Sequence, residues 1–126
     1  LHGPLGSEPV VGEVIGFVLS APGEPTVYIS GDNASLDVVA EIAGRVRVDE
    51  VILFAGAVRM PVISAEPDLL TLDAARSVEA VRLLKPSGVL VAHVDSWAHF
   101  TEDRSVTEAA LRDAGLGHLL RPAQRG

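Results

Sequence analysis

Cysteine is absent from this 126-residue sequence. The absence excludes disulfide bonds, a thiolate nucleophile and a zinc site with cysteine ligands. Any metal ion bound by the chain must therefore be held by His, Asp or Glu side chains. A chain without cysteine is also compatible with a cytoplasmic location, which is the location that we expect.

Basic residues are scarce, with 10 Lys and Arg against 17 Asp and Glu, which gives a net charge of -7. An acidic surface of this kind repels nucleic-acid phosphates and anionic membranes, so we expect neither as a partner. No apolar run reaches the roughly 18 residues that span a bilayer. A basic stretch followed by an apolar one is also missing at the N-terminus, so no secretory signal is predicted.

Hydrophobic residues make up 48% of the chain, which is typical of a globular protein and excludes general disorder. A chain of this length forms one domain, or part of one. Apolar and β-branched runs predict strands over 13–20, 26–30, 51–55 and 89–92. Helices are predicted with caps and end points at Ser35 and Gly44, at Thr71 and Lys85, and at Ser105 and Gly115.

The predicted order of elements is β-β-α-β-α-β-α, which indicates an α/β layered fold. The runs at 51–55 and 89–92 are apolar without interruption, as in strands that are covered on both faces. Three short helices are too few to cover both faces of such a sheet. We therefore expect residues 1–126 to form half of a layered domain, and the start at Leu1 rather than Met agrees with a segment missing upstream.

Three polar residues stand where predicted strands meet loops. Asp32 follows the second strand, His93 follows the fourth, and His2 lies in a Gly/Pro-rich loop before the first. Ligands of α/β sheets gather outside the carboxyl ends of the strands, where Asp32 and His93 both fall. His and Asp also bind zinc-like metals without cysteine. Alone, each residue also fits a structural role, Asp32 as a turn residue and His93 as a hydrogen-bonded histidine.

Several short segments resemble, in one order, the C-terminal half of a metallo-β-lactamase-fold hydrolase. The similar branch is the group of L-ascorbate-6-phosphate lactonase and N-acyl-phosphatidylethanolamine phospholipase D. The resemblance extends from Leu1 to about Pro122. It is carried by the segments His2-Gly3-Pro4, Gly12-Glu13-Val14-Ile15-Gly16-Phe17-Val18-Leu19, Val27-Tyr28-Ile29-Ser30-Gly31-Asp32, Leu72-Asp73-Ala74-Ala75, Ala92-His93 and Trp97-Ala98-His99-Phe100.

The resemblance implies a four-layer αβ/βα sandwich with two divalent metal ions between its sheets, usually zinc, with manganese or iron as alternatives. His2 and His93 would each bind one metal ion, and the catalytic Asp32 would bridge both. A hydroxide bridging the ions would attack an ester, a lactone or a phosphodiester, in a small-molecule or lipid-like substrate. Trp97, His99 and Phe100 follow His93 closely enough in the sequence to line the pocket or support the ligands. Arg59, in the irregular segment after the strand 51–55, would bind a substrate phosphate.

One family feature is missing, because the sequence contains no His-x-His-x-Asp-His run. Two protein ligands for each metal ion would remain, fewer than the three of a usual catalytic zinc site. We therefore expect the chain alone to be inactive and to expose the apolar face of its sheet. An N-terminal half, a partner chain or a second copy of the chain would complete the fold.

Two other functions stay open at this point. The segments 48–53 and 83–91 resemble part of a Rossmann-like methyltransferase that uses S-adenosylmethionine, although no glycine-rich cofactor loop follows an early strand. Alternatively, the chain is a non-catalytic half-domain that binds a partner through its exposed sheet. Bound metal would oppose both of these alternatives.

Overall fold

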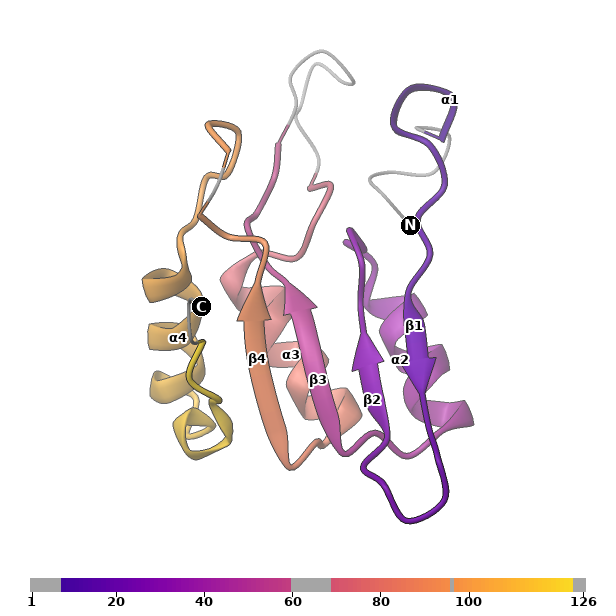
Figure 1. The fold of residues 1–126 in the computed structure, drawn as a ribbon. Coiled ribbons are helices and arrows are strands. Elements are labelled where there is room, and N and C mark those ends of the chain that lie inside the picture. The colour runs from indigo at the N-terminus through magenta and orange to yellow at the C-terminus, as the bar shows by residue number, and fades with distance from the viewer. Residues whose placement is uncertain (1–7, 60–68, 96, 124–126) are drawn as a thin grey trace.

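The computed structural model describes residues 8–59, 69–95 and 97–123. In these ranges one sheet is flanked by helices, in the predicted order, with a short helix added near each end (Figure 1). The strands are β1 (Phe17–Leu19), β2 (Val27–Ile29), β3 (Glu50–Phe54) and β4 (Gly88–Ala92). The helices are α1 (Glu8–Val11), α2 (Leu36–Arg45), α3 (Ala74–Leu84), α4 (Arg104–Asp113) and the 3-10 helix η1 (Gly117–Leu119). No helix in these ranges is long and apolar enough to cross a membrane.

The four strands follow one another across the sheet in sequence order. β1 is antiparallel to β2, whereas β2, β3 and β4 are parallel. Ile29, Ile52 and Leu90 are register partners and therefore lie in one row across the three parallel strands. Because these strands share a direction, their carboxyl ends meet at one edge, which is the edge where the predicted site falls.

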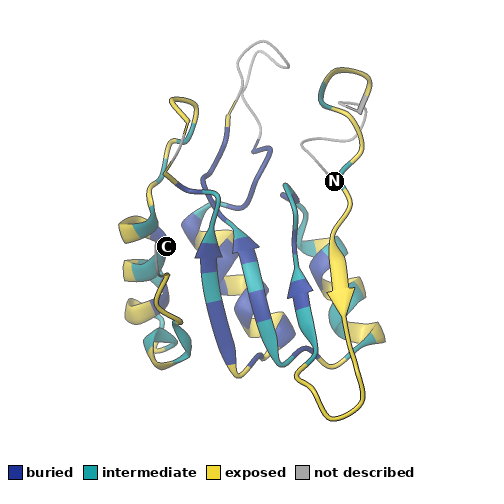
Figure 2. Cartoon of the chain, in the orientation of Figure 1, coloured by how far each residue is buried: buried dark blue, intermediate teal, exposed yellow. Residues whose placement is uncertain are grey.

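One face of the sheet packs against α2, α3 and α4 and forms the main core. Alternate residues of the parallel strands point into it, as the period of a β-strand requires (Figure 2). The helices contribute a matching apolar stripe. The core includes Tyr28, Val51, Leu53, Val89 and Val91 from the sheet, with Val39, Val78, Val81 and Leu111 from the helices.

The opposite face, which we call the outer face, is apolar but only half-buried or exposed. Its members on the parallel strands are only partly buried, and those on β1 are exposed, Phe17 by 56% and Leu19 by 53%. The long helices of the described residues cover only one side of the strands predicted at 51–55 and 89–92. The second face of these strands is left open, which agrees with the expectation of a half-built layer that exposes the apolar face of its sheet. The apolar residues of the outer face are Phe17, Leu19, Val27, Ile29, Ile52, Phe54, Leu90 and Ala92. Glu50, the register partner of Val27, lies on the same face, and its carboxylate accepts hydrogen bonds from Arg121.

The helix caps differ in part from the prediction. Ser35 caps α2, but Asp73 and Asp103, not Thr71 and Ser105, cap α3 and α4. The hydroxyl of Thr71 is buried and accepts a hydrogen bond from the Val58 backbone N–H at 3.0 Å, so it is not available as a cap.

Candidate functional site

Asp32 stands just beyond β2, after a glycine that the geometry requires. Gly31 has a φ of +59°, and a Cβ at this position would lie 2.7 Å from the Ile15 carbonyl oxygen. Ser30, the residue before it, connects the turn to β3 by hydrogen bonds. Its hydroxyl accepts a hydrogen bond from the Phe54 N–H at 3.0 Å and donates one to the Gly31 carbonyl at 2.9 Å. The turn therefore holds Asp32 in a fixed place at the carboxyl edge of the sheet.

His93 stands just beyond β4 and has a φ of +56°. A non-glycine residue in the left-handed region is uncommon, and such residues concentrate at functional sites. This backbone conformation turns the chain directly after the strand. The His93 side chain then meets Asp32, with its Nδ1 atom 3.0 Å from Asp32 Oδ1.

The two ligand types that the sequence predicted thus come together across the sheet edge. Each side chain is 30% exposed. The Nδ1 atom of His93 is itself buried and makes no hydrogen bond of good geometry within the part of the chain that the structure describes. One carboxylate oxygen and one imidazole nitrogen therefore converge on the same small region.

This donor pair fits a divalent metal ion. Bonds of about 2.0–2.2 Å to one ion, at angles between 90° and tetrahedral, place two ligand atoms roughly 2.8–3.6 Å apart. The observed 3.0 Å lies within that range. The site is incomplete, however, because residues 8–59, 69–95 and 97–123 contain no group of three metal-binding side chains. The third predicted ligand, His2, lies outside the described residues.

Aromatic rings surround His93. The ring of Phe54 lies 5.0 Å from the imidazole between centroids, and that of Phe100 lies 4.9 Å away in an edge-on arrangement. Phe100 also meets His99 at 5.1 Å, and His99 stacks on Trp97 at 5.9 Å. Of the aromatic residues predicted after the fourth strand, Phe100 is thus the one in ring contact with His93.

The other predicted pocket residues lie farther out. Trp97 is 64% exposed and His99 is exposed, as a pocket rim requires. Arg59 is exposed as well, and its backbone pairs with Leu69 in an isolated antiparallel bridge after β3. Binding of a substrate phosphate by Arg59 stays a prediction.

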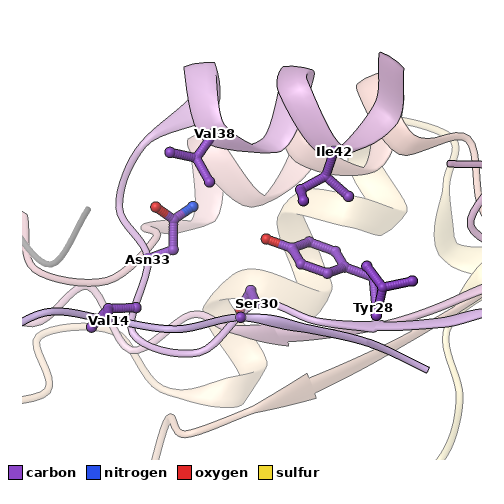
Figure 3. Close-up of a pocket in the computed structure, with 8 residues that line it drawn as sticks. Val14, Tyr28, Ser30, Asn33, Val38 and Ile42 are labelled. Carbon is purple, nitrogen blue, oxygen red and sulfur yellow. The ribbon is translucent and has the colours of Figure 1, made fainter. Parts of the chain in front are cut away.

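A small cavity of about 80 Å³ lies behind the Asp32 turn, between the sheet and α2 (Figure 3). The ring of Tyr28 lies against it, with the hydroxyl on the side of Asn33. Burial raises the pKa of the Tyr28 phenol above its ordinary value. The remaining lining residues are Val14, Gly16, Val18, Ser30, Val38 and Ile42. No sequence pattern predicted this cavity, because its walls come from three separate elements, β1, β2 and α2, and the loops beside them.

The fold is shared with solved metal-dependent hydrolases. It is similar to an isothiocyanate hydrolase from Delia radicum gut bacteria, with a TM-score of 0.83, 18% identity, and coverage of 97% of this chain and 48% of that one. A possible metal-dependent hydrolase from Veillonella parvula gives a TM-score of 0.84 at 18% identity, over 98% of this chain and 48% of that one. The metallo hydrolase Igni18 from Ignicoccus hospitalis gives 0.68 at 21% identity, over 88% and 42%.

These likenesses define an α/β fold that spans about half the length of the hydrolases it matches. No protein-family model and no curated protein sequence matches the chain. The half-domain predicted from the sequence is therefore confirmed as a fold.

Proposed function

We propose that the chain is the part of a metal-dependent hydrolase, of the metallo-β-lactamase superfamily, that carries Asp32 and His93. The observation that supports this function is the 3.0 Å approach of Asp32 Oδ1 and His93 Nδ1 at the carboxyl edge of a hydrolase-like sheet. The proposal extends to His2 as a further ligand and to two divalent ions, zinc being the first candidate. Within that superfamily, we propose that the chain is most similar to the group of L-ascorbate-6-phosphate lactonase and N-acyl-phosphatidylethanolamine phospholipase D.

Each side chain of the pair has a defined task in this proposal. Asp32 and His93 would hold metal through the two facing atoms, and the fixed turn at Gly31 keeps the carboxylate in position. Bound divalent ions would supply polarisation of an ester, lactone or phosphoryl oxygen and a water of lowered pKa. No serine or cysteine nucleophile is then required. Trp97, at the exposed end of the aromatic series, would contact the substrate.

The outer face supports a second part of the proposal, which is that another layer completes the site. Phe17, Ile29, Ile52 and Leu90 form one apolar row across the whole sheet. A contiguous exposed apolar surface of this kind is usually a contact surface. The covering layer would come from an N-terminal half, a partner chain or a second copy, and would bring the ligands that this chain lacks.

Metal retention tests the assignment. In the protein expressed from its native gene, Asp32→Ala and His93→Ala should each abolish the retention of zinc that native mass spectrometry measures. Asp113→Ala is the matched control, because Asp113 is an exposed acidic residue on α4. Retention and turnover that survive Asp32→Ala would refute the hydrolase assignment.

The same spectra separate the hydrolase from the binding half-domain. A species heavier than 13.2 kDa that contains a second segment and metal supports the hydrolase. An assembly made only of metal-free copies of the 13.2 kDa chain supports a non-catalytic binding module instead. The structural matches favour the hydrolase over the methyltransferase, since they name metal-dependent hydrolases.

A further inference from the structure

The imidazole of His93 is held between two phenylalanine rings from different parts of the chain. Phe54 ends β3 and lies tilted by 42° against the imidazole, and Phe100 meets it at 78°. Rotation of an imidazole about its second side-chain torsion is otherwise broad. Rings on two sides restrict that rotation and so restrict where Nδ1 points.

Phe100 and the next residue contact the segment that follows β3, at Gly56 and Ala57. Gly56 leaves the space for the ring, because a Cβ there would lie 2.4 Å from Phe100 Cδ1. The next residue fastens the contact, since Thr101 donates from its N–H to the Gly56 carbonyl at 3.1 Å and from its hydroxyl to the Ala57 carbonyl at 2.6 Å. Phe100 is therefore positioned by backbone contacts as well as by side-chain packing.

Phe54 connects the site to the outer face. It stands two residues after Ile52 on the same strand, and both belong to the half-buried side of β3. A layer that covers Ile52 would also press on Phe54. The ring in contact with His93 is thus also part of the surface that remains uncovered in this chain.

We propose that Phe54 and Phe100 are positioning residues that hold the His93 imidazole with Nδ1 toward Asp32, and that Phe54 makes this orientation sensitive to coverage of the outer face. The proposal rests on the function proposed above, in which His93 binds metal. Neither phenylalanine touches the metal in this account. Their effect passes through the orientation of His93.

The three phenylalanines of the chain provide a matched experiment. Phe54→Leu and Phe100→Leu remove rings beside His93. Phe17→Leu is the control for loss of a ring from the outer face, because Phe17 lies on β1, at the sheet edge opposite β4, and leucine keeps an apolar side chain there. Phe100→Met is a second variant that fills the space flexibly, and Phe100→Tyr retains the ring. All variants are made in the protein expressed from its native gene.

The first readout is the imidazole NMR spectrum of His93 in the metal-free protein. Phe54→Leu and Phe100→Leu should move its ring signals toward those of the exposed His118, while Phe17→Leu leaves them in place and Phe100→Tyr restores them. The second readout is zinc affinity by chelator competition, where loss of a residue that orients a metal ligand costs about tenfold or more. A loss of thermal stability alone, with His93 signals and zinc affinity equal to those of Phe17→Leu, would overturn the proposal.

The two readouts separate the failure of this proposal from failure of the function. If no variant binds zinc and yet the His93 signals respond as expected, the rings position His93 but the metal assignment is wrong, which overturns the part of the proposal that concerns metal. If zinc binds through Asp32 while Phe100→Leu and Phe100→Met behave like Phe17→Leu, the metal assignment stands and the positioning role is refuted.

Discussion

Replacing Gly56 with alanine tests the packing behind His93 with a single methyl group. The new Cβ would lie 2.4 Å from Phe100 Cδ1 and 2.6 Å from the His93 carbonyl oxygen, both well inside contact distance. The phenylalanine ring can shift, but the carbonyl belongs to the backbone that holds the site. Overpacking of this kind costs about 1–3 kcal/mol. For a chain of this length, that corresponds to a fall in melting temperature of roughly 3–6 °C for each kcal/mol.

Gly44→Ala is the matched control, because there the added methyl group should raise the stability. Gly44 lies inside α2, and a Cβ there would meet nothing within 4 Å. Alanine at this position should therefore stabilise the helix by about 0.5 kcal/mol. The assay is thermal and urea unfolding of both variants, followed by zinc competition. A Gly56→Ala melting temperature equal to or above that of Gly44→Ala would refute the described packing of Phe100 and His93.

Two further predictions concern titratable groups. Tyr28 is the single tyrosine, so absorbance near 295 nm reports its ionisation alone, and its midpoint should lie above the ordinary 10.0. The pKa of Tyr28 is higher in the folded state than in the unfolded state, so ionisation of the phenol favours unfolding. The free energy of unfolding should therefore fall as the pH rises from about 10 to the folded pKa, and Tyr28→Phe should remove this fall. Asp103 caps α4, and hydrogen bonds from Ser105 and Val106 hold its pKa below 3.8. The stability that the Asp103 carboxylate adds is present above pH 3.8 and is lost as the pH falls through the lowered pKa, so Asp103→Asn should reduce the loss of stability in acid, measured by urea unfolding between pH 2 and pH 5. An acid limb identical to that of the unsubstituted protein would contradict this prediction.

Local sequence patterns predicted the positions of all four strands, because apolar β-branched runs and turn residues act over a few positions. The first strand is shorter than predicted, since only Phe17–Leu19 of the range 13–20 pairs with β2. The capping of α2 by Ser35 could also be predicted, since the serine hydroxyl accepts a hydrogen bond from the backbone N–H of Val38, only three residues later. The prediction that Thr71 caps α3 rested on the same local pattern and was wrong, because the Thr71 hydroxyl accepts a hydrogen bond from the backbone N–H of Val58, 13 residues earlier. Gly44 was predicted to end a helix that in fact ends at Arg45, which shows that one glycine near a helix end is tolerated.

The site shows the same division between local and distant information. Strand ends placed Asp32 and His93 at one edge, and the structure brings them to 3.0 Å. The short spacing after His93 indicated a pocket role for Phe100, which stands seven residues later. Nothing in the spacing indicated that Phe54 also meets His93, since that contact joins β3 to a residue 39 positions later. Gly56 directly follows the strand predicted at 51–55, and no local pattern indicates a role for it. Its role becomes visible once Phe100 occupies the space that a side chain would fill.

A charge in the middle of the outer face tests the proposed covering layer. Ile52 lies between Ile29 and Leu90 in the apolar row, so Ile52→Glu would place a carboxylate at the centre of any sheet-on-sheet contact. Burying an unpaired charge costs several kcal/mol, whereas the same charge facing water costs little. The control is Val106→Glu on α4, where the side chain is 44% exposed.

The outer face is either covered by another layer or exposed to water, and native mass spectrometry and hydrogen exchange give different results in the two cases. With a covering layer, Ile52→Glu should dissociate or unfold the assembly, expose β3 amides to exchange and release bound metal, because the completing ligands leave with that layer. Val106→Glu should leave mass, exchange and metal content unchanged. Equal behaviour of the two variants would mean that the outer face stays in water, and the ligands missing from the Asp32 and His93 site would then have to come from the carboxyl edge of this same chain.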